Sequence, residues 1–196
     1  MRAALPIHLQ RLCGAGALAA LALVTTPRLA TAQDAAKDAV VAVRKAYLGN
    51  IEEVQGKLLQ LAEAIPADKY SWRPAPGVRS IGEVFMHVAS EYYVWSPRSF
   101  GATPSPLIAM NREGFEKFEA TATKENVLKH LKEGFAYGRQ AVEGVDPSSL
   151  LGTRKFFGQD ANTTDIALGM AGDLHEHLGQ LIAYARMNGI KPPWTK

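Results

Sequence analysis

The amino-acid sequence predicts an all-α protein, a four-helix bundle with a long crossover connection between its second and third helices. Apolar residues recur at steps of three and four in four separate stretches, which is the periodicity of amphipathic helices. No stretch shows a convincing alternation of apolar and polar residues that would indicate a strand. Residues 96–122 contain three prolines and separate the second stretch from the third. A connection of this length in a small domain usually crosses over a bundle or covers a site.

The first predicted helix covers residues 38–65. Its apolar stripe continues over about seven turns, and Pro66 ends it because proline cannot continue a helix. The stripe consists of Val40, Val43, Tyr47, Ile51, Val54, Leu58, Leu61 and Ile65.

The second predicted helix begins at Ser80 and reaches its limit at Pro97. Ser80 and Glu83 form an S-x-x-E capping box ahead of an apolar run. The buried side of this helix is expected to consist of Ile81, Val84, Phe85, Val88 and Tyr92. The connection after it has room for a short helix within residues 107–118.

The third and fourth predicted helices cover residues 124–145 and 162–188. Gly134 and Gly138 lower the intrinsic helicity of the third helix, so packing must support it. Cap residues open the fourth helix, and the pair at 188–189, Asn-Gly, ends it. Residues 146–161 are expected to form a second connecting loop.

Residues 1–32 have the layout of a secretory signal peptide. Arg2 and Arg11 provide a basic start, residues 13–24 form an apolar run too short to span a bilayer, and residues 30–32 form an A-x-A cleavage site. We therefore expect a mature helical domain of residues 33–196 that is periplasmic or secreted. The alternative is an N-terminal anchor that is not cleaved.

Removing this segment changes the charge and the cysteine content. The formal net charge is +3 for 22 basic and 19 acidic residues; without three arginines it becomes 19 − 19 = 0. A neutral chain does not favour a nucleic-acid or anionic membrane partner. Cys13, the only cysteine, also leaves, which excludes a disulfide, a thiolate ligand and a cysteine nucleophile. No later segment is long and apolar enough to cross a membrane.

Two polar residues lie on the apolar stripe of the fourth helix. Asp173 and His177 are four residues apart, which places them about 40° from each other on one helix face. Burying a carboxylate and an imidazole costs several kcal/mol unless both find partners. We therefore expect partners for both groups.

His87 can face the interior from the second helix. Together with Asp173 and His177 it provides two imidazoles and one carboxylate, which are good ligands for a divalent metal ion. Three protein ligands would leave a position open for water or substrate, and a metal there can polarise an oxygen. The alternatives are a hydrogen-bonded core histidine at 87 and a simple ion pair of Asp173 with His177 or an arginine.

Four further polar residues are not counted among the expected metal ligands. Glu91, one turn after His87, is either a supporting residue of the site or a surface charge. Gln180, three residues after His177, either orients water or substrate or is a helix-packing amide. His130 and His175 are both expected at the surface.

Two segments resemble the DinB-like superfamily of bacterial metal-binding four-helix proteins. The first is YSWRPAPG at residues 70–77, followed by the capping box and His87. The second is HLGQ at residues 177–180, followed by Tyr184, Arg186, NGI at 188–190 and PP at 192–193. The resemblance covers nearly all of the chain after residue 32.

The resemblance implies a divalent metal, commonly zinc or nickel, held by one histidine of the second helix and two of the fourth. His87 and His177 match two of these positions, and Asp173 stands where the family usually has the third histidine. A carboxylate there changes the hardness of the ligand set and leaves the metal open, iron included. Characterised members include thiol-dependent S-transferases and isomerases that use intracellular thiols, which an exported chain would meet rarely.

The sequence thus predicts an exported, metal-dependent hydrolase- or transferase-type protein with a small-molecule substrate or ligand. A non-catalytic bundle that binds a ligand or partner is the alternative. An iron-dependent oxygenase is a third, because two histidines and a carboxylate are the ligand set of that class. A homodimer is left open.

Overall fold

The computed structural model describes residues 26–195, and from Ala36 onward the chain forms one compact unit, to which this description applies. The chain is mostly helical with one short two-stranded sheet, which confirms the all-α class in its broad form. Residues 1–25 of the predicted signal peptide lie outside the described residues, and residues 26–32 belong to the first helix. Its cleavage stays a prediction. Within the described residues, no helix has the length and apolar character needed to span a membrane.

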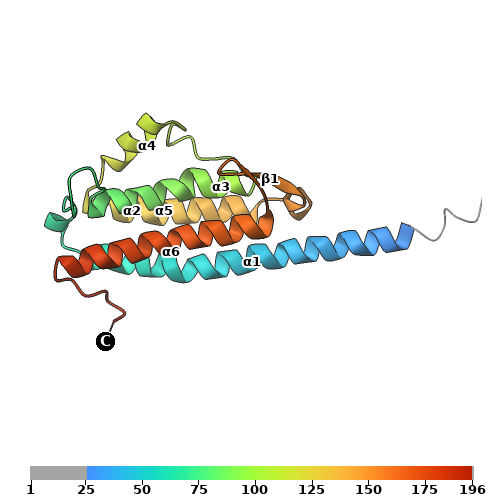
Figure 1. Cartoon of the computed structure of the whole chain (residues 1–196), viewed down its shortest axis with the longest axis horizontal. Helices are drawn as coiled ribbons and strands as arrows, with labels where there is room; N and C mark the ends of the chain where they lie inside the picture. Colours follow the sequence, from blue (N-terminus) through green and yellow to red (C-terminus); the bar gives the residue numbers. More distant parts are fainter. Residues whose placement is uncertain (1–25, 196) are drawn as a thin grey trace, which may run out of the picture. The chain divides into compact units, whose positions relative to one another are not determined.

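Within residues 26–195, four long helical segments supply most of the larger of two hydrophobic clusters. They are α1 (Thr26–Ala64), the continuous segment of α2 (Ile81–Ser90), η2 (Glu91–Trp95) and α3 (Ser96–Ser99), α5 (Lys124–Glu143), and α6 (Thr163–Met187). In Figure 1, α2 is flanked by α5 and α6, and it contacts both. Helix α1 contacts α5 where Arg139 donates a hydrogen bond to Glu52, and it contacts α6 where His175 hydrogen-bonds with Asn50. The predicted stripes of these segments supply most of the core.

The second segment contains a π-helical turn. Its start is as predicted, because the Ser80 hydroxyl accepts a hydrogen bond from the Glu83 backbone and the Glu83 carboxylate accepts one from the Ser80 backbone. The π turn η2 follows α2 directly, and four of its five residues, Glu91 to Val94, are buried. Single π turns within α-helices are rare and occur frequently at functional sites.

The long connection after α3 contains α4 (Arg112–Glu119), which begins at the side-chain cap of Asn111. This short helix packs against α2, above it in Figure 1. The connection thus covers the outer side of the helix that carries His87. A further short 3-10 turn, η1 (Ala67–Lys69), lies between α1 and α2.

The connection before α6 differs from the predicted loop. It contains a 3-10 turn, η3 (Pro147–Leu150), and an antiparallel hairpin of β1 (Thr153–Phe156) and β2 (Gln159–Asn162). In the register of this hairpin, Thr153 pairs with Asn162 at the open end and Phe156 pairs with Gln159 next to the turn. Each strand has four residues and is mostly exposed, so no apolar alternation marks it. The expectation that the protein lacks strands was therefore wrong at this point.

Two glycines allow α5 to approach the second segment closely. A Cβ atom added at Gly138 would lie 2.8 Å from Tyr92 Cδ1 and 3.0 Å from the Tyr92 carbonyl oxygen. One added at Gly134 would lie 3.1 Å from the Ala89 carbonyl oxygen. The low helicity of these residues is therefore compensated by tight packing against the π turn.

We predict that Gly138→Ala lowers the free energy of unfolding by about 1–3 kcal/mol, because the added methyl group overpacks a fixed backbone contact. Gly56→Ala is the matched control in α1, where an added Cβ meets no atom within 4 Å. That change should stabilise the protein by roughly 0.5–1 kcal/mol through helix propensity alone. Urea denaturation of both variants measures the difference, and stabilisation by both would contradict the packing argument.

Candidate metal centre

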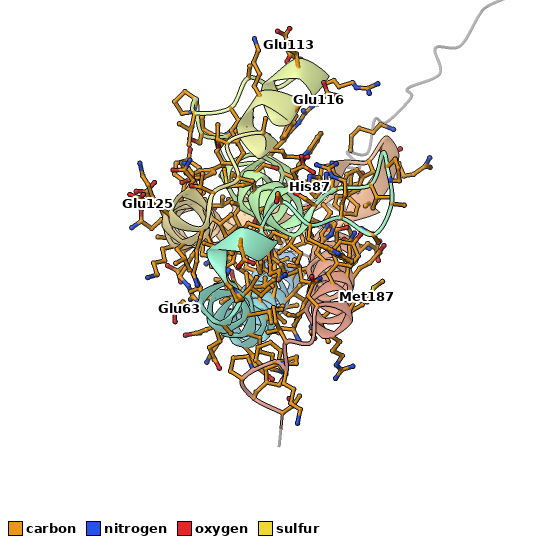
Figure 2. All side chains as sticks on the ribbon, turned by 90° about the vertical axis from the view of Figure 1, so that its left-hand side faces the viewer. Glu63, His87, Glu113, Glu116, Glu125 and Met187 are labelled. Atoms are coloured by element: carbon orange, nitrogen blue, oxygen red, sulfur yellow. The ribbon has the colours of Figure 1, made fainter. Side chains whose placement is uncertain are left out.

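His87, Glu91 and His177 bring three ligand atoms together, all within 4.8 Å of one another. His87 comes from α2, Glu91 begins the π turn, and His177 comes from α6. Glu91 Oε1 lies 3.3 Å from His87 Nε2 and 3.4 Å from His177 Nε2. Figure 2 looks along the helices and shows His87 on α2, below α4. The two predicted histidines therefore meet, with a carboxylate between them.

The far side of the His87 ring is held by residues outside this group. His87 Nδ1 lies 2.7 Å from Glu119 Oε1 at the end of α4. Glu119 in turn accepts two hydrogen bonds from Arg79, at 2.7 and 3.1 Å. Because a carboxylate accepts hydrogen bonds, this contact assigns a hydrogen to Nδ1. The remaining nitrogen, Nε2, faces Glu91.

The His177 ring is held in the same sense. Its Nδ1 lies 3.4 Å from Gln180 Oε1, and Gln180 Nε2 donates to the Tyr184 hydroxyl at 3.0 Å. Gln180 thus links His177 to the core tyrosine of α6, whose ring packs edge-on against Trp72. In protein metal sites, ligating histidines almost always donate their other ring N–H to such a partner.

This arrangement places electron-rich atoms against one another. A neutral imidazole with its hydrogen on Nδ1 has a lone pair on Nε2, and both Nε2 atoms face the buried Glu91 carboxylate. The repulsion is relieved either by protons on both imidazoles or by one cation among the three groups.

The pKa values show how the protein balances these charges with protons. Burial alone lowers the pKa of His87, but its hydrogen bonds to Glu119 and Glu91 outweigh burial and raise it to about 9. Burial raises the pKa of Glu91, but the hydrogen bonds from His177 and His87 lower it to about 2. Burial lowers the pKa of His177, but the hydrogen bond with Glu91 and the negative charges of Glu91 and Asp173 together raise it. Without a metal, both imidazoles therefore hold a proton more strongly than a free imidazole does, and the carboxylate between them stays ionised more readily.

Asp173 adjoins this group from its more exposed side. Its Oδ1 lies 3.8 Å from His177 Nε2, and 35% of its side chain is exposed. Burial and a hydrogen bond with Glu91 raise the pKa of Asp173 to about 6. Asp173 therefore takes up a proton at a higher pH than an ordinary aspartate does.

Glu91 is not a surface charge, since the residue is only 7% exposed. The alternative reading of Glu91 as a solvated residue was wrong. The side-chain oxygen of Gln180 contacts the His177 ring. Glu119 and Arg79 were missed, because Glu119 lies in a proline-rich connection without periodicity and Arg79 lies outside any helix.

The other two histidines of the helical unit lie apart from the site. His175 is exposed, as predicted, with Nε2 3.3 Å from Asn50 Oδ1. His130 is not at the surface, because its side chain is only 14% exposed and packs against the rings of Tyr93 and Phe118. Neighbouring aromatic rings from the π turn and the crossover, rather than its own helix stripe, cover it.

The donor set and its spacing fit a divalent metal ion. Ligand atoms about 2.1 Å from one ion lie roughly 3.4 Å apart in a tetrahedron. The two distances from Glu91 Oε1 to the imidazole nitrogens, 3.3 and 3.4 Å, match this spacing. Two imidazoles with a carboxylate suit zinc, nickel or iron.

A cavity of about 360 Å³ lies beside His87 on the side of α4. It is lined by Arg79, His87, Trp95, Arg112, Phe115, Glu116 and Glu119. The crossover therefore both orients His87 and shapes the space next to it.

We predict that Glu119→Ala lowers zinc affinity by about 10- to 100-fold, because the His87 ring loses the acceptor that orients it. Glu116→Ala is the matched control, since Glu116 lies on the same helix and lines the same cavity. Competition titration with a chromophoric chelator measures both variants. Equal losses would show that Glu119 acts only through the local charge.

We also predict that zinc affinity rises with pH up to about pH 9, because a ligating imidazole must lose its proton. The pKa of His87 in the folded protein lies above its ordinary value. Its contribution to metal-free stability is therefore complete below about pH 6.5 and lost as the pH rises through about 9. Calorimetry in buffers of different ionisation enthalpy measures the released protons. An affinity independent of pH would contradict the charge balance derived above.

The comparisons with known proteins agree with the sequence resemblance. The sequence matches the family model of the DinB superfamily over residues 50–181. No curated protein matches it. The structure is similar to that of a DinB-like protein from Bacillus cereus ATCC 10987, with a TM-score of 0.61, 13% identity, and coverage of 78% of this chain and 97% of that chain. At this identity the likeness concerns the fold. Because the family model covers well over half of the chain, the protein belongs to the DinB superfamily.

Proposed function

We propose that this DinB superfamily protein is a four-helix bundle that holds a divalent metal ion between α2 and α6. Its reaction would be of the hydrolase or transferase type, on a small-molecule substrate. One observation carries the proposal: two imidazole Nε2 atoms and a buried carboxylate converge, while residues outside the group hold both Nδ1 atoms.

In this proposal, His87, His177 and Glu91 bind the ion. Asp173, which the sequence suggests as the third ligand, hydrogen-bonds to Glu91 at the exposed side. There its Oδ1 can bind the ion in place of Glu91 or accept a hydrogen bond from substrate. A divalent ion in this position would supply Lewis-acid chemistry, polarising a substrate oxygen or lowering the pKa of a water molecule.

The residues around the ligands have separate roles. Glu119, fixed by Arg79, keeps His87 Nε2 directed into the site. Gln180 does the same for His177. The cavity beside His87 is not lined by Glu91, Asp173 or His177. It therefore offers space for the part of a substrate that lies away from the ion, with Phe115 and Trp95 as its apolar wall. Zinc and nickel suit this donor set best, and iron fits it as well.

Export is a separate part of the proposal. It is supported by the basic start, the apolar run and the A-x-A site within residues 1–32. The mature protein would then act in the periplasm or outside the cell.

A non-catalytic ligand-binding role is the second candidate. It is favoured by the charge balance of the site, since Glu91 and Glu119 raise the pKa of His87 while the pKa values of both carboxylates are lowered in turn. Such a site can stay folded without a metal. A chelator would then leave the thermal midpoint unchanged.

The test is metal analysis of the purified protein after refolding with zinc, nickel or iron in turn. We expect one ion per chain, and a loss of affinity of about 100-fold or more in His87→Ala and His177→Ala. His175→Ala, an exposed histidine of the same helix, is the matched control and should bind normally.

Two further variants separate the carboxylates. Glu91→Gln should abolish stoichiometric binding, and Asp173→Asn should weaken it less if Glu91 is the ligand; the reverse order would assign Asp173. Bound metal should raise the free energy of unfolding by about 2.7 kcal/mol at a hundredfold excess over Kd. Absence of binding with all three metals would reject the metal site and leave the second candidate.

A further inference from the structure

The tip of the hairpin carries an exposed aromatic residue in an unfavourable backbone conformation. Phe157 has φ 45°, in the left-handed region, and is 66% exposed. Bulky residues rarely adopt this conformation, and glycine or asparagine would fit the turn better. Residues held in such conformations cluster at binding sites. The turn therefore presents a phenyl ring at a position where folding alone would favour another residue.

Phe156, the residue before Phe157, anchors the hairpin on α6. The Phe156 ring lies against Gly169 of α6, where an added Cβ would approach ring atoms to 2.7 and 2.9 Å. Phe156 and Phe157 pack edge to face, with ring centroids 4.6 Å apart. The glycine thus lets the hairpin lie close to α6, which fixes the direction of Phe157.

A cavity of about 310 Å³ lies between this hairpin and α3. Its lining consists of Trp95, Arg98, Ser99, Lys155, Phe156, Phe157 and Gly158. The rings of Trp95 and Phe157 have centroids 5.8 Å apart and form an aromatic corner. This volume accommodates a one- or two-ring ligand.

The cavity also holds an uncompensated cation. The Arg98 guanidinium lies 5.5 Å from the centroid of the Trp95 ring. Across residues 26–195, its side chain has no hydrogen bond or ion pair with another residue. Lys155, by contrast, pairs with Asp160 at 2.9 Å. Arg98 therefore has its planar set of N–H donors free for a carboxylate.

We propose that this cavity binds a small aromatic carboxylate. The ligand's ring packs against Trp95 and Phe157, and its carboxylate accepts hydrogen bonds from Arg98. The site is distinct from the His87, Glu91 and His177 group and needs no metal. Trp95 also lines the cavity beside His87, so a ligand bound here lies next to the space proposed for substrate.

The test is a titration of the full chain, freed of metal with a chelator, with 2-naphthoate followed by NMR and calorimetry. Arg98→Gln should weaken binding by about tenfold, because it removes a charge-assisted pair. The neutral analogue 2-naphthylmethanol should bind at least about tenfold more weakly to the unchanged protein. Arg186→Gln, an exposed arginine at the end of α6, is the matched control and should bind normally.

Phe157→Gly separates binding from folding. Glycine adopts the left-handed conformation without strain, so this variant should be at least as stable as the parent while losing most of the affinity. The combined His87→Ala and His177→Ala variant should bind 2-naphthoate normally.

Three results would each overturn the proposal. The first is the absence of saturable 2-naphthoate binding up to about 10 mM, well beyond the range of specific sites. The second is an affinity that neither Arg98→Gln nor Phe157→Gly changes, and the third is a loss of binding only in the double histidine variant. The last result would place the carboxylate at the metal centre. It would leave the proposed metal function intact.

Discussion

Two imidazoles and a carboxylate share one buried corner between α2 and α6, and their charges must balance before these helices can pack. Glu91 is held ionised in a largely water-free place, where an uncompensated charge would be costly. The compensation comes either from protons on the histidines or from a cation. Either solution ties α2 to α6 through Glu91, because the carboxylate contacts a histidine on each helix.

Other parts of the fold bury Glu91 and orient His87. Four of the five residues of the π turn that begins at Glu91 are buried. Helix α5 can cover this turn closely only because glycines replace larger residues at the contact. The crossover supplies Glu119, which is the reason why His87 points inward instead of rotating toward water. The residue that orients His87 thus comes from the connection between α3 and α5 and not from one of the four long helical segments.

The sequence predicted those features that repeat with helical period. The α2 capping box and the stripe of α6 follow from spacing, since residues three or four apart share a helix face. The meeting of His87 with His177 does not follow from spacing alone; it is expected because both can face the interior and because the family resemblance places them together. Features set by tertiary contact escaped this reasoning. The hairpin strands are short and exposed, and a single π turn of five residues is too short to leave a periodic pattern in the sequence. Glu119 reaches His87 from a connection whose path no local pattern defines. For the same reason Glu91 could be read as a surface charge, because its burial depends on His177 from a distant helix.

The pairing of His87 with Glu119 and with the partners on α6 has a consequence for folding order. These groups are far apart along the chain, and within the described residues α6 follows the other helices in sequence. The proposed cation site is therefore complete only when α6 has docked, so local contacts cannot assemble it early. Under the proposed export of an unfolded chain, the proposed ion would be drawn from the metals outside the cytoplasm. The composition of that pool, as much as the affinity of the ligands, would then decide which metal the protein carries.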